Sequence, residues 1–124
     1  MPEAVRWTIQ HARTHKPLAT QARIARSAVA RMVGLLGRSS LPAGEGLVLS
    51  PCRAIHTHFM RFPIDAVFID ETWTVVAAFQ ALRPWRMVGG GKRARGVLEL
   101  PAGTLKRVPV SAGDRLVIEP TEQR

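Results

Sequence analysis

Side chains that could carry chemistry are concentrated in residues 52–70, which read C-R-A-I-H-T-H-F-M-R-F-P-I-D-A-V-F-I-D. This otherwise apolar segment holds the single cysteine of the chain, two of its four histidines and two aspartates. The His-x-His pair, His56 and His58, could place two imidazoles on one metal ion. Side chains that could complete such a ligand set are Cys52, Asp65 and Glu99. A lone His-x-His is more often two partly exposed histidines without a ligand role, and we assign no metal site and no cofactor.

The cysteine offers a second kind of chemistry. A thiolate at Cys52 beside the imidazole of His56 could act in nucleophilic catalysis. A lone cysteine between Pro51 and an apolar stretch is more often a small buried thiol. We therefore assign no catalytic residue.

Two carboxylates fall within stretches whose composition predicts burial. Asp65 lies in a segment that is apolar on both faces, and Glu99 lies within V-L-E-L-P at 97–101. A buried carboxylate without partners costs several kcal/mol, so each one must find hydrogen-bond donors. Each could simply pair with an arginine or cap a turn. The functional interpretation is one polar pocket, lined by His56, Arg61, Asp65, Arg86 and Glu99.

The residues around this pocket indicate a class of ligand. Two arginines would favour a carboxylate, a phosphate or a sugar acid. Trp85 could stack on a flat ligand or a sugar ring, or it could pack over the open end of a barrel. The candidate ligand-binding residues are His56, Arg61, Asp65, Trp85, Arg86 and Glu99.

Residues 84–95 contain three consecutive glycines. These glycines predict a mobile loop, which could be a lid or a long hairpin connection. No G-K-[ST] sequence follows them, so they do not predict a phosphate-binding loop.

Most of the chain is typical of short strands. Alternating or dense apolar residues predict strands over 5–10, 46–50, 55–60, 64–70, 73–82, 95–100 and 115–119. The segments 64–70 and 73–80 predict an antiparallel hairpin, because only a short turn separates them. Within 55–60, alternation would point Ile55 and Phe59 into the core and the two histidines toward a cleft or water. One short helical turn is expected at 104–108.

One amphipathic helix is predicted from Thr20 to Leu36. Apolar residues fall on one side at helical spacing, namely Ile24, Ala28, Met32, Leu35 and Leu36. Arginines fall on the opposite side, namely Arg23, Arg26 and Arg31. Thr20 could cap the start, and Gly37 could end the helix in a left-handed turn. This basic face could dock on nucleic acid or an acidic protein, although a solvated helix face has the same pattern.

Many short strands and one helix predict a mainly β fold with some α+β character. The architectures that fit are a sandwich, a jelly roll or a partly closed barrel of mostly antiparallel strands. A chain of 124 residues suits one core. We expect a single domain over 20–119, a strand and basic loop over 1–19, and a frayed tail over 120–124.

Charge and composition bound the setting of the protein. The formal net charge is +9, and residues 1–40 carry seven basic side chains against Glu3 alone. A basic end indicates an anionic neighbour such as nucleic acid, an acidic protein or a lipid surface, or it serves solubility. No run approaches the ~20 apolar residues of a membrane-spanning helix, and residues 1–7 lack a secretory pattern. A single cysteine cannot form an internal disulfide, and we expect a cytoplasmic protein.

Three groups of motifs resemble one family when taken together. They are G-L-L-G-R at 34–38, H-T-x-x-M-R-x-P-I-D at 56–65 followed by V-F-I-D, and V-L-E-L-P-A-G at 97–103 with G-D at 113–114. This set resembles the bacterial and archaeal family called domain of unknown function 192, over about residues 20–119. The resemblance implies a compact, mainly β domain of sandwich or jelly-roll-like topology with a small helical part. It implies no activity, cofactor or substrate, and His58 falls at a position that the pattern leaves open.

Three functions remain open at this point. The first is a non-catalytic binding module that holds a small anionic or polyhydroxy ligand, or a partner segment, in a polar cleft. The second is a hydrolase- or isomerase-like enzyme with Asp65 or Glu99 as general base, its pKa raised by burial, assisted by His56. The third is an accessory protein that docks on nucleic acid or an acidic partner through the basic helix face.

Overall fold

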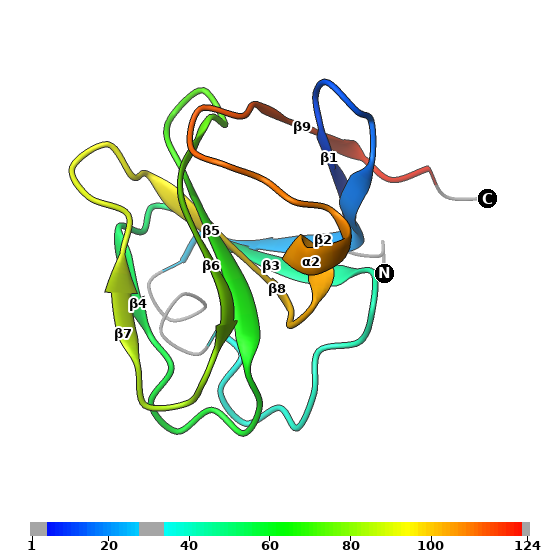
Figure 1. Ribbon diagram of the computed structural model, residues 1–124. Coiled ribbons are helices and arrows are strands. Elements are labelled where there is room, and N and C mark those ends of the chain that lie inside the picture. The colour runs from blue at the N-terminus through cyan, green and yellow to red at the C-terminus, as the bar shows by residue number, and fades with distance from the viewer. Residues whose placement is uncertain (1–4, 28–33, 123–124) are drawn as a thin grey trace.

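The fold is mainly β, as the sequence predicts. The computed structural model describes residues 5–27 and 34–122 (Figure 1). The strands are β1 (Trp7–His11), β2 (Pro17–Ala25), β3 (Glu45–Leu49), β4 (Ala54–His56), β5 (Ile64–Ile69), β6 (Val75–Leu82), β7 (Met87–Gly89), β8 (Gly96–Pro101) and β9 (Leu116–Pro120). The one helix within the described ranges is the short α2 (Thr104–Arg107).

Seven strands form one curled sheet in the order β6-β5-β8-β3-β2-β1-β9, and β4 pairs with β7 in a separate two-stranded sheet. All pairs are antiparallel except β2 with β3. The two edges of the large sheet meet at one corner, where Thr74 bridges Arg115. There the amide of Val75 donates to the carbonyl of Asp114 at 2.8 Å. The sheet is therefore a half-barrel whose two edge strands, β6 and β9, are joined at this corner.

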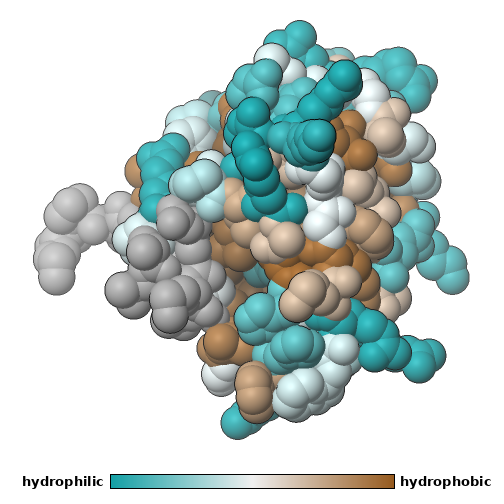
Figure 2. All heavy atoms as spheres, turned by 90° about the vertical axis from the view of Figure 1, so that its left-hand side faces the viewer, coloured by the Kyte–Doolittle hydropathy of each residue, from teal (hydrophilic) through white to brown (hydrophobic). Residues whose placement is uncertain are grey.

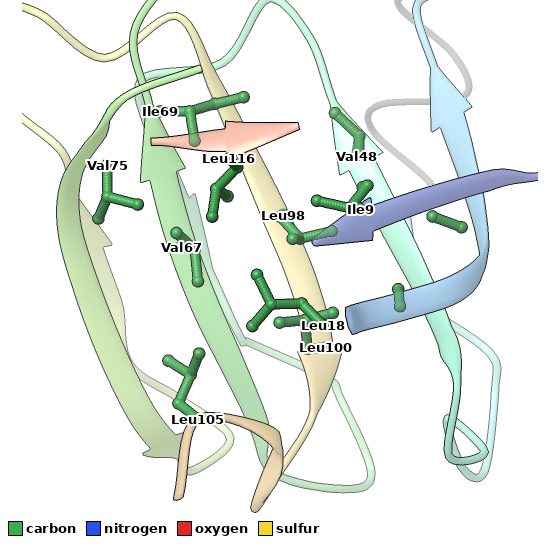
Figure 3. Packing of buried hydrophobic residues seen from close by; sticks show 12 residues of the cluster. Ile9, Leu18, Val48, Val67, Ile69, Val75, Leu98, Leu100, Leu105 and Leu116 are labelled. Carbon is green, nitrogen blue, oxygen red and sulfur yellow. The ribbon is translucent and has the colours of Figure 1, made fainter. Parts of the chain in front are cut away.

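Apolar side chains pack against both faces of this sheet. Inside the curl, Ile9, Val67 and Leu98 belong to one buried cluster (Figure 3). On the outer face of β3, β5 and β8, a second cluster includes Phe68 and Val97. Because both faces are covered, β5 is buried at all six positions. The prediction that the strand around Asp65 is buried on both sides is thus confirmed over Ile64–Ile69.

The helix predicted from Thr20 to Leu36 is wrong over its first part. Residues Pro17–Ala25 form β2, which runs parallel to β3 and antiparallel to β1. Pairing on both sides satisfies the backbone of β2, so tertiary context overrides the local helical spacing. Residues 28–33 lie outside the described part of the chain. Residues 34–37 form a turn that ends at Gly37 with φ of +82°, the left-handed conformation that a glycine adopts without strain.

The strand predicted over 55–60 is also shorter than expected. It ends at His56, and Phe59 adopts φ of +66°, which breaks the alternation. As a result Phe59 is 71% exposed, the reverse of the prediction, and Met60 is buried. The expected loop at 84–95 contains β7, whose pairing with β4 orders it. The hairpin of β5 and β6 and the helical turn at 104–108 are confirmed.

Candidate functional site

A cleft of about 430 Å³ lies against the outer face of the half-barrel. Its floor comes from β3 and β8, and its walls come from the turn at 34–36 and from residues 52–60. The lining residues are Gly34, Leu35, Leu36, Leu49, Cys52, Ala54, Ile55, His56, Phe59, Met60 and Glu99. Most of these side chains are apolar, which is typical of small-molecule sites that add a few placed polar groups.

Glu99 is the buried polar group of this cleft. It projects from the middle of β8 on the same face as its cross-strand neighbours Leu47 and Ala66. Its exposed fraction is 4%, and no described residue offers its carboxylate a hydrogen bond or an ion pair. Burial alone raises the pKa of Glu99 to about 7. A carboxyl group placed among apolar side chains without a partner is the arrangement expected of a binding or catalytic group.

Asp65 is buried as expected, but it serves the main chain. Its Oδ1 accepts the amide of Ala81 and its Oδ2 accepts the amide of Leu105, each at 2.8 Å. Both oxygens are therefore satisfied, and the carboxylate ties β6 and α2 to β5. The sequence allowed an arginine partner or a turn cap, whereas the partners are two main-chain amides 16 and 40 residues away.

Asp65 and Glu99 do not share a pocket. Asp65 pairs with Leu100 across β5 and β8, and the next residue, Ala66, pairs with Glu99. Successive residues of a strand point to opposite faces. Asp65 thus faces the interior of the curl, while Glu99 faces the outer cleft, and the predicted common pocket is divided by the sheet.

The two arginines of the predicted pocket also lie elsewhere. Arg61 and Arg86 are exposed and do not line the cleft. Cys52 does line it, and its Sγ donates to the carbonyl of Ala54 at 3.1 Å. The cleft is consequently less basic and more apolar than the sequence suggests.

His56 stands at the rim, within a row of aromatic rings. Its ring centroid lies 4.9 Å from that of His58, which lies 5.2 Å from Trp85. Trp85 in turn meets Phe59 edge-on at 4.7 Å. Trp85 is thus absent from the cleft lining but contacts Phe59, which belongs to that lining, so it lies beside the cleft mouth.

Thr57 joins the segment that follows β4 to residues 83–86 at the rim of the cleft, a role that the sequence pattern does not predict. Its hydroxyl donates to the carbonyl of Arg83 at 2.6 Å and accepts the amide of Arg86 at 2.9 Å. Its own backbone amide donates to the carbonyl of Arg86 at 2.8 Å. The signal that could have found it is the threonine of the H-T-x-x-M-R motif, a polar residue placed where the strand pattern fails.

No three histidine, cysteine, aspartate or glutamate side chains gather closely enough to hold a metal ion in residues 5–27 and 34–122. Within those same ranges, no helix is long and apolar enough to cross a membrane. Arg23 lies on β2 and Arg26 follows it, so the described part of the chain presents no basic helix face. Arg31 lies outside that part.

A curled mainly β half-barrel with an apolar cleft and a buried carboxyl group defines the class of this protein. The chain belongs to the family described as domain of unknown function 192, an uncharacterised ACR, whose profile matches residues 9–118. The resemblance seen in the motifs is therefore confirmed.

Relatives of this chain carry the family name UPF0127. The protein of Pyrococcus horikoshii is 31% identical over 99 residues, which is 77% of this chain and 85% of that protein. The protein of Pyrococcus abyssi is 42% identical over 62 residues, 50% of this chain and 52% of that protein. The protein of Thermococcus kodakarensis is 34% identical over 71 residues, 57% of this chain and 45% of that protein. For these last two, the match spans about half the length of the relative.

Two solved structures share the fold. A protein described as a candidate transcription regulator from Sinorhizobium meliloti superposes with a TM-score of 0.79 at 23% identity, covering 97% of this chain and 98% of that one. A protein of unknown function from Novosphingobium aromaticivorans superposes with a TM-score of 0.77 at 20% identity, covering 90% and 82% respectively. At these identities the likeness establishes the fold.

Proposed function

We propose that this protein is a non-catalytic binding domain whose cleft holds a small, largely apolar molecule carrying one amino group. The observation that carries this proposal is the buried carboxyl of Glu99, which no described residue pairs with, in a mostly apolar cleft. A ligand ammonium would supply the missing partner, and the apolar walls would receive the rest of the ligand.

The anionic or polyhydroxy ligand expected from the sequence fits this cleft poorly. Arg61 and Arg86, the groups that would receive an anion, are outside it. The ionised form of Glu99 would repel an anion, and the apolar walls offer few partners to a sugar. A cationic group with an apolar body meets both features of the site.

An alkyl amine is already protonated near neutral pH, because its ordinary pKa lies well above 7. Its binding would therefore release the carboxyl proton of Glu99 to solvent. The resulting ion pair would be shielded from water by the cleft walls. Affinity should therefore rise with pH until Glu99 is ionised, at about pH 7.

The test is a thermal-shift series with alkyl amines, alkyl alcohols and alkyl carboxylates of matched length. A ligand that prefers the folded state raises Tm by mass action. We expect shifts from the amines alone, lost in Glu99→Gln. The matched control is Glu119→Gln, since Glu119 is an exposed carboxylate on β9. Equal shifts from amines and carboxylates, or an amine shift retained in Glu99→Gln, would refute the proposal.

An enzymatic role is the second candidate, and the pKa of Glu99 favours it. A general base works best with a pKa close to the operating pH, and Glu99 at about 7 meets that condition. His56 lines the same cleft and could assist. Asp65, the alternative general base, accepts a backbone amide at each of its two carboxylate oxygens. Turnover of an amine or ester probe that is abolished in Glu99→Gln would favour this role over simple binding.

A further inference from the structure

Three large apolar side chains stand exposed beside the cleft mouth. Phe59 is 71% exposed, Trp85 57% and Met87 72%. Met87 on β7 is the cross-strand partner of His56 on β4, so the two side chains share one face. With the ring contacts from His56 through His58 to Trp85 and Phe59, they form one continuous surface. We call it the aromatic patch, made of His56, His58, Phe59, Trp85 and Met87.

Two residues of this patch have a strained backbone conformation. Phe59 has φ of +66° and Trp85 has φ of +67°, the left-handed conformation that non-glycine residues avoid. Thr57 holds the Trp85 segment in place, because its carbonyl accepts the amide of Trp85 at 3.1 Å. Strain maintained at exposed aromatic residues points to a functional surface. Figure 2 views this side of the molecule, where hydrophobic residues near the middle of the face have hydrophilic ones above, below and to the right of them.

The segments that form the patch are strongly basic. Residues 51–62 and 83–95 together contain seven arginines and lysines and no acidic residue. Arg53, Arg61, Arg83 and Arg86 are exposed, and none of these four takes part in an ion pair with a described residue. An exposed apolar surface with uncompensated positive charge around it is complementary to a surface that is apolar inside and anionic outside.

We infer that the aromatic patch docks on an anionic lipid bilayer. Phe59, Trp85 and Met87 enter the interface between headgroups and acyl chains, and the surrounding arginines bind lipid phosphates. Single-stranded nucleic acid fits less well, because bases stack on free ring faces. Here Trp85 is already packed against two other rings, and Met87 offers no ring at all.

Docking in this way would also orient the cleft. His56 and Phe59 belong both to the patch and to the cleft lining. The cleft mouth would therefore open beside the bilayer surface.

The test is co-sedimentation of the full chain with vesicles of phosphatidylcholine alone and with vesicles that also contain phosphatidylglycerol. We expect binding to the anionic vesicles, weakened by salt. Trp85→Ser and Met87→Ser should each lower the partition coefficient about tenfold, since each removes an apolar group from the interface. Met87 lies on a strand without backbone strain, so its variant keeps the test valid if Trp85→Ser folds poorly. Val117→Ser, at an exposed apolar residue of β9, is the matched control and should bind like the parent.

A second measurement distinguishes insertion from surface attraction. Lipids with brominated acyl chains should quench the fluorescence of Trp85, and this quenching should be lost in Trp85→Ser. The inference is overturned if the protein does not bind anionic vesicles, or if both apolar variants bind them as tightly as the parent does. Displacement of the protein from the vesicles by single-stranded oligonucleotides would overturn it as well. Because these variants leave Glu99 intact, failure here is distinguishable from failure of amine binding in the cleft.

Discussion

The buried carboxyl of Glu99 should make this protein more stable in weak acid than at neutral pH. The ordinary pKa of a glutamate is 4.5, and burial raises that of Glu99 to about 7. Between these values the folded state keeps the proton that the unfolded state releases. The contribution of Glu99 to the free energy of unfolding is therefore greatest below pH 4.5. It falls as the pH rises toward 7 and is constant above pH 7.

The size of the effect follows from the shift. At about 1.4 kcal/mol per pKa unit, it amounts to about 3 kcal/mol. That is a large fraction of the ~5–15 kcal/mol that holds a typical domain folded. The Glu99→Gln variant keeps the shape of the side chain and cannot ionise. Its free energy of unfolding, minus that of the parent, should thus increase by about 3 kcal/mol between pH 4 and pH 8.

The assay is urea unfolding followed by tryptophan fluorescence across this pH range. Taking the difference between variant and parent cancels the titration of all other groups, provided that they are independent of Glu99. Glu119→Gln, which removes an exposed carboxylate, should give a difference that changes far less with pH. A flat difference curve for Glu99→Gln would show that the carboxyl is solvated or paired, and the binding site proposed around it would lose its basis.

Three further substitutions probe the frame around the cleft. Gly90→Ala should destabilise the fold by about 1–3 kcal/mol in urea, because the new methyl would lie 2.6 Å from the Cβ of Phe68. Gly89→Ala meets its nearest atoms at 3.5 Å and should cost much less, so equal losses would contradict this reasoning. Thr57→Val should cost about 1–3 kcal/mol, since it leaves the carbonyl of Arg83 and the amide of Arg86 without their partly buried side-chain partner. Faster hydrogen exchange confined to residues 83–86 would be the signature, and unchanged exchange there would count against it. Asp65→Asn should also cost about 1–3 kcal/mol, because the amide nitrogen cannot accept one of the two backbone N–H groups. An unchanged urea midpoint would mean that these bonds contribute nothing.

The strands that build the cleft floor could be predicted from the sequence. Which of their residues share a face of the sheet could not. Apolar residues on both sides of Asp65 correctly indicate burial, and the same holds for Glu99. Whether two buried residues face each other depends on the register between β5 and β8. A shift of one position exchanges the two faces, and local composition carries no information about it.

The helix predicted from Thr20 and the strand predicted over 55–60 are wrong for a related reason. Residues Pro17–Ala25 have a spacing that fits a helix, but their pairing with β1 and β3 comes from distant parts of the chain. Phe59 would belong to the core by hydrophobicity, yet its left-handed backbone turns it outward. Such positions, where local preference and final structure disagree, are typical of functional surfaces.

The pairing of β1 with β9 determines where additional chain could be attached. Trp7 lies directly opposite Pro120 in this ladder, so β1 begins beside the point where β9 ends. Figure 1 shows this pair across the molecule from β4 and β7. A fused domain, an affinity tag or a surface anchor joined at either terminus would thus emerge from the far side. Such a fusion would leave the cleft and the aromatic patch accessible to another molecule.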